Sequence, residues 1–238
     1  GHVDHGKSPL VGRLLSDTGS LPEGKLDFVR DICKQQGKDF EFAFLLDALQ
    51  EEQEQGITID TSQIFFSTAQ RKYVIIDAPG HKEFLKNMVT GAADAEAALL
   101  LIDANEGVQE QSRRHGYILK LLGLTQVAVV INKMDLVGYD QSVFDAIVED
   151  YTEFATSIGI TAFTAMPISG FKGDNITAAS ANTPWYNGPS LIEHLETVEV
   201  NSATDADKPF RMPVQWVNRP NLDFRGFSGL IATGTVRP

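Results

Sequence analysis

The sequence has a single cysteine, Cys33, among its 238 residues. One thiol cannot form an internal disulfide, so the fold does not depend on a disulfide framework. A bystander thiol of this kind fits a reducing compartment, and we expect the protein to be cytoplasmic. The chain also lacks an apolar run as long as a membrane span, so no membrane partner is expected.

Basic residues are scarce as well. The 20 Lys and Arg residues against 32 Asp and Glu residues give a formal net charge of −12. A chain this acidic repels phosphate backbones on average, so binding to nucleic acid would require a local basic patch. The sequence contains no such cluster of Lys and Arg, and nucleic acid is not expected as a partner. The hydrophobic content of 42% is ordinary for a globular protein with a sizeable core.

The first eight residues carry the most specific motif of the chain. They match G-x-x-x-x-G-K-[ST], the pattern of a phosphate-binding P-loop. The backbone N–H groups of such a loop point inward and hold phosphate oxygens. Its lysine adds a charge at the β- and γ-phosphates, and its serine hydroxyl binds the magnesium ion that accompanies the nucleotide. We expect the nucleotide phosphates to be bound by Gly1, His2, Val3, Asp4, His5, Gly6, Lys7 and Ser8.

Downstream of this loop, short apolar runs alternate with amphipathic stretches. The alternation predicts an α/β fold with a mostly parallel sheet and helices on both faces. The expected strands cover residues 57–66, 73–77, 97–103, 127–131 and 162–168. Helices are expected after Ser8, twice within 17–56, and at 81–90, 109–122, 141–158 and 191–200. A P-loop normally follows a strand, so we expect the chain to be a fragment that lacks its first strand.

Two further segments suit a γ-phosphate and its metal ion. Thr58, at the end of a long insert, can close over the γ-phosphate and offer its hydroxyl to magnesium. Asp77 follows an apolar strand and can hold the metal through water, while the Gly80 N–H can reach the γ-phosphate. Each signal is weak alone, because threonine is common in strands and D-x-x-G is a common pattern. Together with the P-loop, they predict magnesium ligands at Ser8, Thr58 and Asp77.

The segment after the apolar run 127–131 suits a guanine base. It carries Asn132, Lys133 and Asp135 in the pattern N-K-x-D. A carboxylate accepts hydrogen bonds from the ring N1–H and the exocyclic amine, and the lysine stem stacks on the ring. Ser169, followed by Gly170, stands at the next strand end and is expected to support the base through its backbone. Ligands of open α/β sheets bind at the carboxyl ends of strands, so the sequence predicts GTP or GDP with Mg²⁺ as ligand.

This set of motifs resembles that of the translation-factor GTPases over essentially the whole chain. The resemblance rests on G-H-V-D-H-G-K-S, on G-I-T-I at 56–59, on D-A-P-G-H at 77–81, on N-K-M-D and on P-I-S-G at 167–170. It implies a P-loop GTPase in which Lys7, Thr58 and the metal act on the phosphates, and His81 orients the attacking water. The alternative for His81 is an ordinary surface residue at a helix start.

Two more stretches narrow the resemblance to the GTP-binding subunits of bacterial sulfate adenylyltransferases: P-W-Y-N-G-P-S-L at 184–191 and V-N-R-P-N-L-D-F-R-G at 217–226. This resemblance implies a hetero-oligomer in which GTP hydrolysis drives the formation of adenylyl sulfate. The ATP and sulfate for that reaction would be bound by a partner subunit. The alternative is an elongation factor 1-alpha-like GTPase that binds aminoacyl-tRNA, against which the net charge and the second stretch argue. A third possibility is weak or absent binding, because Pro9 replaces a threonine of the relatives and the first strand is missing.

Composition also divides the chain. Residues 1–200 are expected to form the GTP-binding domain, and the polar, Asp-rich residues 201–208 a linker. Residues 209–238 are expected to begin a β-barrel domain, with strands at 210–217 and 227–236. Two strands cannot close a barrel, so we expect the chain to stop inside its second domain.

Overall fold

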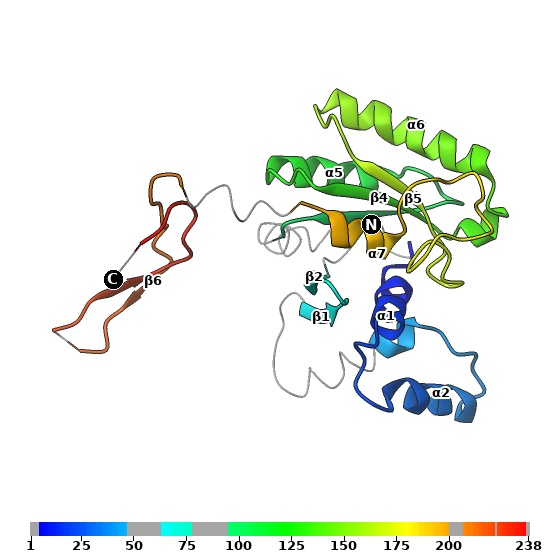
Figure 1. Cartoon of the computed structure of the whole chain (residues 1–238), viewed down its shortest axis with the longest axis horizontal. Helices are drawn as coiled ribbons and strands as arrows, with labels where there is room; N and C mark the ends of the chain where they lie inside the picture. Colours follow the sequence, from blue (N-terminus) through cyan, green and yellow to red (C-terminus); the bar gives the residue numbers. More distant parts are fainter. Residues whose placement is uncertain (1–4, 47–62, 78–94, 200–206, 222, 237–238) are drawn as a thin grey trace. The chain divides into compact units, whose positions relative to one another are not determined.

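The computed structural model describes residues 5–46, 63–77, 95–199, 207–221 and 223–236 (Figure 1). The chain forms two compact units, Gly1–Val198 and Glu199–Pro238. The first unit holds every predicted site residue, and each unit is described by itself below.

A three-stranded parallel sheet forms the centre of the first unit. Its strands are β3 (Ala98–Asp103), β4 (Val127–Asn132) and β5 (Thr164–Pro167), in the order β3-β4-β5. Every residue of β4 is buried, which explains why this strand is a continuous apolar run in the sequence. The predicted ends of these strands differ from the observed ones by at most two residues.

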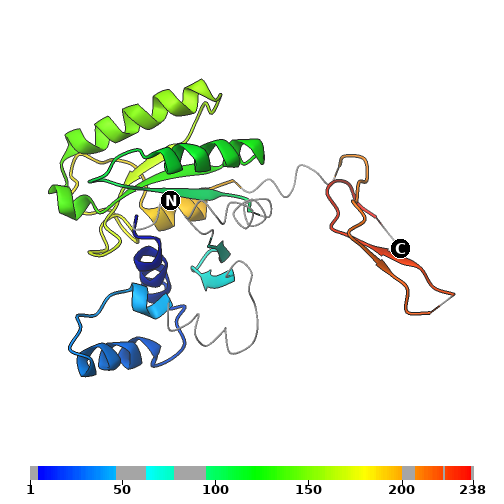
Figure 2. The same cartoon turned by 180° about the vertical axis from the view of Figure 1, so that it is seen from behind.

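Helices cover both faces of this sheet (Figures 1 and 2). Alternate strand residues point to opposite faces of the sheet. Val129 and Ile131 pack on α6 (Gln141–Ser157). Ala128 and Val130 pack on the other face, on α1 (Lys7–Asp17) and α7 (Leu191–Thr197). The expected α/β architecture with helices on both faces is confirmed.

Helix α5 (Glu110–Leu121) connects β3 to β4 and lies beside α6 on the same side of the sheet (Figures 1 and 2). Gly116 lets the two helices approach closely. A Cβ atom at this position would lie 2.6 Å from the hydroxyl oxygen of Tyr151, a fully buried residue of α6. Within the described part of the chain, that hydroxyl has no hydrogen-bond partner.

An antiparallel pair, β1 (Gln63–Ser67) and β2 (Lys72–Ile76), packs on the other side of α1. The four residues that join these strands are too few for a parallel crossover. Ile64 and Phe66 point inward onto α1, while Phe65 between them is 65% exposed. No ladder joins β2 to β3 among the described strands. The predicted strand residues 57–62 and the predicted helix 81–90 lie outside the described residues.

The insert after α1 contains α2 (Lys25–Gln35), which ends at the break predicted near Gly37. Its buried residues Val29 and Cys33 pack on Leu45, so Cys33 is a core residue. The second predicted helix of the insert is helical at residues 43–46, and its continuation lies outside the described residues.

The second unit contains two short antiparallel strands, β6 (Trp216–Asn218) and β7 (Gly226–Ser228), and a bridge between Arg211 and Thr233. Both strands are shorter than the sequence predicted. Their apolar side chains are exposed, with Trp216 at 69%, because a single hairpin has little surface on which to bury them.

None of the helices in the described part of the chain has the length and apolar character required to cross a membrane.

Candidate nucleotide-binding site

The phosphate-binding loop is described from His5 onward, and it turns directly into α1. Gly6 precedes the helix with φ of +81°, a left-handed conformation that glycine adopts without strain. The first turn of α1 therefore presents backbone N–H groups without helical acceptors next to Lys7 and Ser8, an arrangement that suits an anion. Pro9 is the third residue of α1, where its missing N–H removes no bond within the helix.

The phosphate-loop lysine lies beside the predicted metal carboxylate. Lys7 Nζ is 3.6 Å from Asp77 Oδ1, and both side chains are about one fifth exposed, at 21% and 23%. The carboxylate of Asp77 and the hydroxyl of Ser8 are oxygen donors of the kind that Mg²⁺ prefers. The structure thus brings the end of β2 to the start of α1. The other predicted residues of this half lie outside the described residues: Gly1, His2, Val3, Asp4, Thr58, Gly80 and His81.

Asn132, at the end of β4, connects two loops of the site. Its Nδ2 donates a hydrogen bond of 2.9 Å to the carbonyl oxygen of His5, and its Oδ1 accepts one of 2.9 Å from the N–H of Gly170. The side chain is buried, so its polar atoms depend on these partners. A Cβ on Gly6 would lie 2.4 Å from Asn132 Nδ2, so only glycine fits there. Asn132 thus holds the phosphate loop against the loop after β5.

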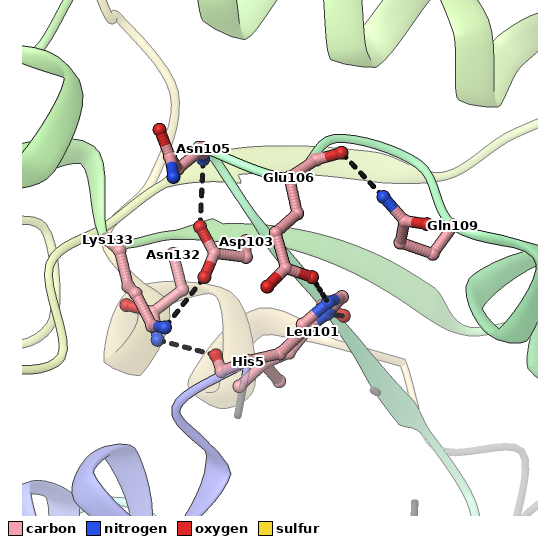
Figure 3. Close-up of polar contacts among 8 residues, drawn as sticks. All are labelled: His5, Leu101, Asp103, Asn105, Glu106, Gln109, Asn132 and Lys133. Atoms are coloured by element: carbon pink, nitrogen blue, oxygen red, sulfur yellow. Dashed lines mark hydrogen bonds and ion pairs between the residues drawn. The ribbon is translucent and has the colours of Figure 1, made fainter. Parts of the chain in front are cut away.

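Lys133 follows Asn132 in a left-handed conformation with φ of 63°. Its Nζ lies 2.7 Å from Oδ2 of Asp103, at the end of the neighbouring strand β3 (Figure 3). The two strands are in register, with Asp103 opposite Asn132, so their carboxyl ends place these side chains together. Asp103 is therefore part of the site, although the sequence marked it only as the last residue of a strand.

Asp135 belongs to a short 3₁₀ helix, η2 (Met134–Val137), that follows Lys133. Its Oδ1 accepts a hydrogen bond of 2.7 Å from the hydroxyl of Ser169, and that hydroxyl oxygen accepts one of 3.0 Å from the N–H of Lys172. The backbone N–H of Ser169 donates to Asp174. Ser169 was expected to contribute through its backbone, and the structure shows that its side chain orients the Asp135 carboxylate.

His5 joins the phosphate loop to the turn between β3 and α5 (Figure 3). The ring is fully buried, with Nδ1 3.0 Å from the carbonyl oxygen of Leu101 and Nε2 3.2 Å from Oε2 of Glu106. His5 was expected to belong to the phosphate loop, whereas no motif in the sequence indicated Glu106. Asp103 is the last residue of the predicted strand 97–103, and Glu106 follows it by three residues. Their position at the carboxyl end of a strand was the feature that could have indicated both as site residues.

A polar network holds the loop that carries Ser169 and Gly170. Asn175 donates 2.8 Å hydrogen bonds to the carbonyl oxygen of Pro167 and to Thr183 Oγ1. Asp174 accepts hydrogen bonds from the hydroxyls of Tyr139 and Ser180 and from the amide of Asn182. Burial opposes ionisation of Asp174, but these three donors together lower its pKa below the ordinary value. The same burial and the Asp174 carboxylate raise the pKa of Tyr139.

The chain is similar to a family of GTP-binding domains and to enzymes of known name. The family model of the elongation factor Tu GTP binding domain matches residues 1–203. Bifunctional enzyme NodQ of a Rhizobium species (strain N33) is 51% identical over the whole chain, which covers 37% of that protein. Sulfate adenylyltransferase subunit 1 of Citrobacter koseri is 49% identical over the whole chain, which covers 50% of that protein. The chain therefore spans half or less of the length of these curated relatives.

Two of the solved structures that match the chain were determined with guanine nucleotides bound. The structure of sup35 complexed with GDP matches the chain with 25% identity and a TM-score of 0.60. The match covers 98% of this chain and 50% of the sup35 chain. The GTPase-like domain of S. cerevisiae Ski7, bound to GTP, matches the chain with a TM-score of 0.64. The match covers 98% of this chain and 57% of the Ski7 chain. The Ski7 domain is only 19% identical and supports the fold alone.

Proposed function

The chain belongs to the family of elongation factor Tu GTP-binding domains, and we propose that it binds GTP and GDP with Mg²⁺ and hydrolyses GTP within a sulfate adenylyltransferase. The nucleotide proposal rests on one observation above all. Asn132 hydrogen-bonds both His5 of the phosphate loop and Gly170, which supports a single site made of the described part of that loop and the residues predicted for guanine. The proposal of a sulfate-activating enzyme rests on the relatives at about half identity over the whole chain.

The phosphate half acts by charge and position. Lys7 is paired with Asp77 at 3.6 Å and is partly exposed, so the more negative phosphates compete successfully for its ammonium group. The N–H groups at the start of α1 hold phosphate oxygens, as helix N-termini do. Magnesium would be held by Ser8, Thr58 and Asp77, and it would neutralise charge on the β- and γ-phosphate oxygens.

The base half acts by hydrogen bonding and stacking. Ser169 turns Asp135 so that the carboxylate can accept from the N1–H and the exocyclic amine of guanine, groups that adenine lacks. The stem of Lys133 covers one face of the ring. Guanine is therefore preferred over adenine at this site.

The hydrolytic step requires a positioned water molecule. We assign its orientation to His81, with Lys7 and Thr58 stabilising the phosphates. His81→Ala should leave GTP binding nearly intact and slow hydrolysis by about 100-fold or more, the range for a positioned catalytic group. Equal turnover in the variant, measured in the assembled enzyme, would remove His81 from the mechanism.

The rest of the enzyme is proposed from its relatives. The name subunit 1 implies a second subunit, and we assign to that partner the binding of ATP and sulfate and the formation of adenylyl sulfate, in a cytoplasmic hetero-oligomer. Residues 1–200 would form the GTP-binding domain, 201–208 a linker and 209–238 the start of a β-barrel. The two compact units, Gly1–Val198 and Glu199–Pro238, support a boundary near residue 200.

Capture of a partner tests the proposed function. The intact protein is expected to bind an adenylyltransferase subunit, and the assembled complex to hydrolyse GTP faster when ATP and sulfate are both present. A translation GTPase would instead bind aminoacyl-tRNA, an alternative that the family itself raises. Binding of aminoacyl-tRNA, with no response of GTP hydrolysis to ATP and sulfate, would overturn the proposal.

A further inference from the structure

The two carboxylate oxygens of Asp103 have different partners. Oδ1 accepts a hydrogen bond of 2.8 Å from the N–H of Asn105, which closes the turn after β3. Oδ2 lies 2.7 Å from the ammonium nitrogen of Lys133 (Figure 3). The Asp103 side chain is 4% exposed and that of Lys133 is 30% exposed. The ion pair is therefore anchored on a buried carboxylate, while part of the lysine remains open to solvent.

The Lys133 side chain is held at both ends. Its backbone follows Asn132, whose side chain is hydrogen-bonded to His5 and Gly170. Its stem runs past the phosphate loop, where Cε lies 3.9 Å from the place that a Cβ on Gly6 would occupy. Its ammonium ends on Asp103. A lysine side chain normally has many rotamers, and the contact with Asp103 favours the one whose stem crosses the site.

We propose that Asp103 is a positioning residue for guanine binding, which fixes the Lys133 stem in place before the nucleotide arrives. The inference rests on the proposed function, since it assigns the Lys133 stem to the face of the base. Ordering a long side chain reduces binding affinity when it occurs during binding. Asp103 orders the stem in advance, so its contribution to affinity depends on the base and passes entirely through Lys133.

A purely structural role for Asp103 would have a different signature. The turn closed by Oδ1 also carries Glu106, which lies against His5 of the phosphate loop. Damage to this turn would therefore weaken the binding of phosphates as well as that of the base. Loss of Lys133 positioning alone would weaken only ligands that carry the base.

The test uses Asp103→Asn in the 238-residue chain. The amide oxygen of this variant still accepts from Asn105, but its NH₂ group cannot hold the ammonium of Lys133. N-methylanthraniloyl-GDP serves as the bound probe, displaced either by GDP or by inorganic tripolyphosphate. We expect the affinity for GDP to fall by about threefold to tenfold, as for one side chain that must be ordered on binding. The affinity for tripolyphosphate should stay unchanged.

Two further variants complete the test. Asp150→Asn removes a carboxylate that pairs with Arg113 between α5 and α6, away from the site, and should not change either affinity. In the background of Lys133→Met, Asp103→Asn should have no further effect on GDP, because the effect passes through the lysine.

An unchanged or tighter affinity of Asp103→Asn for GDP would overturn the inference, and so would an equal loss for GDP and tripolyphosphate. An additive effect in the Lys133→Met background would also overturn it. Failure of the unsubstituted chain to bind the GDP probe would overturn the proposed function itself, and with it the role of Asp103.

Discussion

The side-chain amide of Asn132 donates a hydrogen bond of 2.9 Å to the backbone carbonyl of His5, across 127 positions of the sequence. Both residues are buried. The bond joins the end of β4, where the base is expected, to the loop where the phosphates are expected. The proposed sites for the base and for the phosphates are thus linked through one side chain, and a change in that side chain should weaken the binding of both.

Asn132→Asp tests this link. One carboxylate oxygen can still accept from Gly170, but the other would face the His5 carbonyl and leave two acceptors in contact. Because this pair is buried, we expect the affinities for GDP and tripolyphosphate to fall together by about tenfold or more. Calorimetric titration of both ligands measures the effect, with Asn187→Asp on an exposed loop as the control. A loss confined to GDP would show that Asn132 serves the base alone.

The Asp174 network should contribute stability that depends on pH. The donors to Asp174 lower its pKa in the folded state, so its charge stabilises the fold above the ordinary pKa of about 3.9. That contribution is lost as the pH falls through the lowered pKa. Asp174→Asn should reduce the free energy of unfolding by about 1–2 kcal/mol at pH 7, and by less below about pH 4.

Urea denaturation at pH 7 and pH 3 measures this difference. Asp31→Asn on the exposed face of α2 is the matched control and should change stability at neither pH. A deficit of Asp174→Asn that stays the same at both pH values would show that the charge of Asp174 does not contribute.

The hydroxyl of Tyr151 should be dispensable for stability. It is buried without a hydrogen-bond partner among the described residues, and burial raises its pKa to about 12. Because a buried polar group without a partner destabilises the fold, Tyr151→Phe should leave the free energy of unfolding unchanged or raise it by up to about 1 kcal/mol. Thermal unfolding measures this effect.

A substitution at Gly116 tests the close packing of α5 against the Tyr151 hydroxyl. Gly116→Ala places a Cβ 2.6 Å from the Tyr151 hydroxyl oxygen and should destabilise the protein. In the Tyr151→Phe background the oxygen is gone, so part of the destabilisation should disappear. Strictly additive effects of the two substitutions would contradict the described packing of α5 on α6.

The ends of the buried parallel strands could be predicted from the sequence to within two residues. The runs that became β3 and β4 are buried on both faces, so their apolar residues are consecutive and their ends are sharp in the sequence. The strands of the second unit were predicted too long, because apolar residues such as Trp216 indicate a strand even where the described residues leave them exposed. The roles of Thr58, Gly80 and His81 remain predictions, since these residues lie outside the described part of the chain.

The pairings inside the site could not be predicted from the sequence. Asp103 and Lys133 are 30 positions apart, and Ser169 and Asp135 are 34 apart. Nothing in the local pattern around either residue indicates its partner, because both pairs depend on the parallel register of β3, β4 and β5. The sequence places these four residues at the carboxyl edge of the sheet. Which of them pair with each other becomes clear only from the three-dimensional structure.

Guanine specificity is the central claim, and Asp135→Asn in a competition between GTP and xanthosine triphosphate tests it most directly. The amide places an N–H donor where the carboxylate accepts, and xanthine carries a carbonyl in place of the exocyclic amine of guanine. The unsubstituted chain should prefer GTP, and the variant should bind GTP at least about tenfold more weakly while gaining affinity for xanthosine triphosphate. A variant that keeps the original preference for GTP would contradict the assignment of Asp135 to the base.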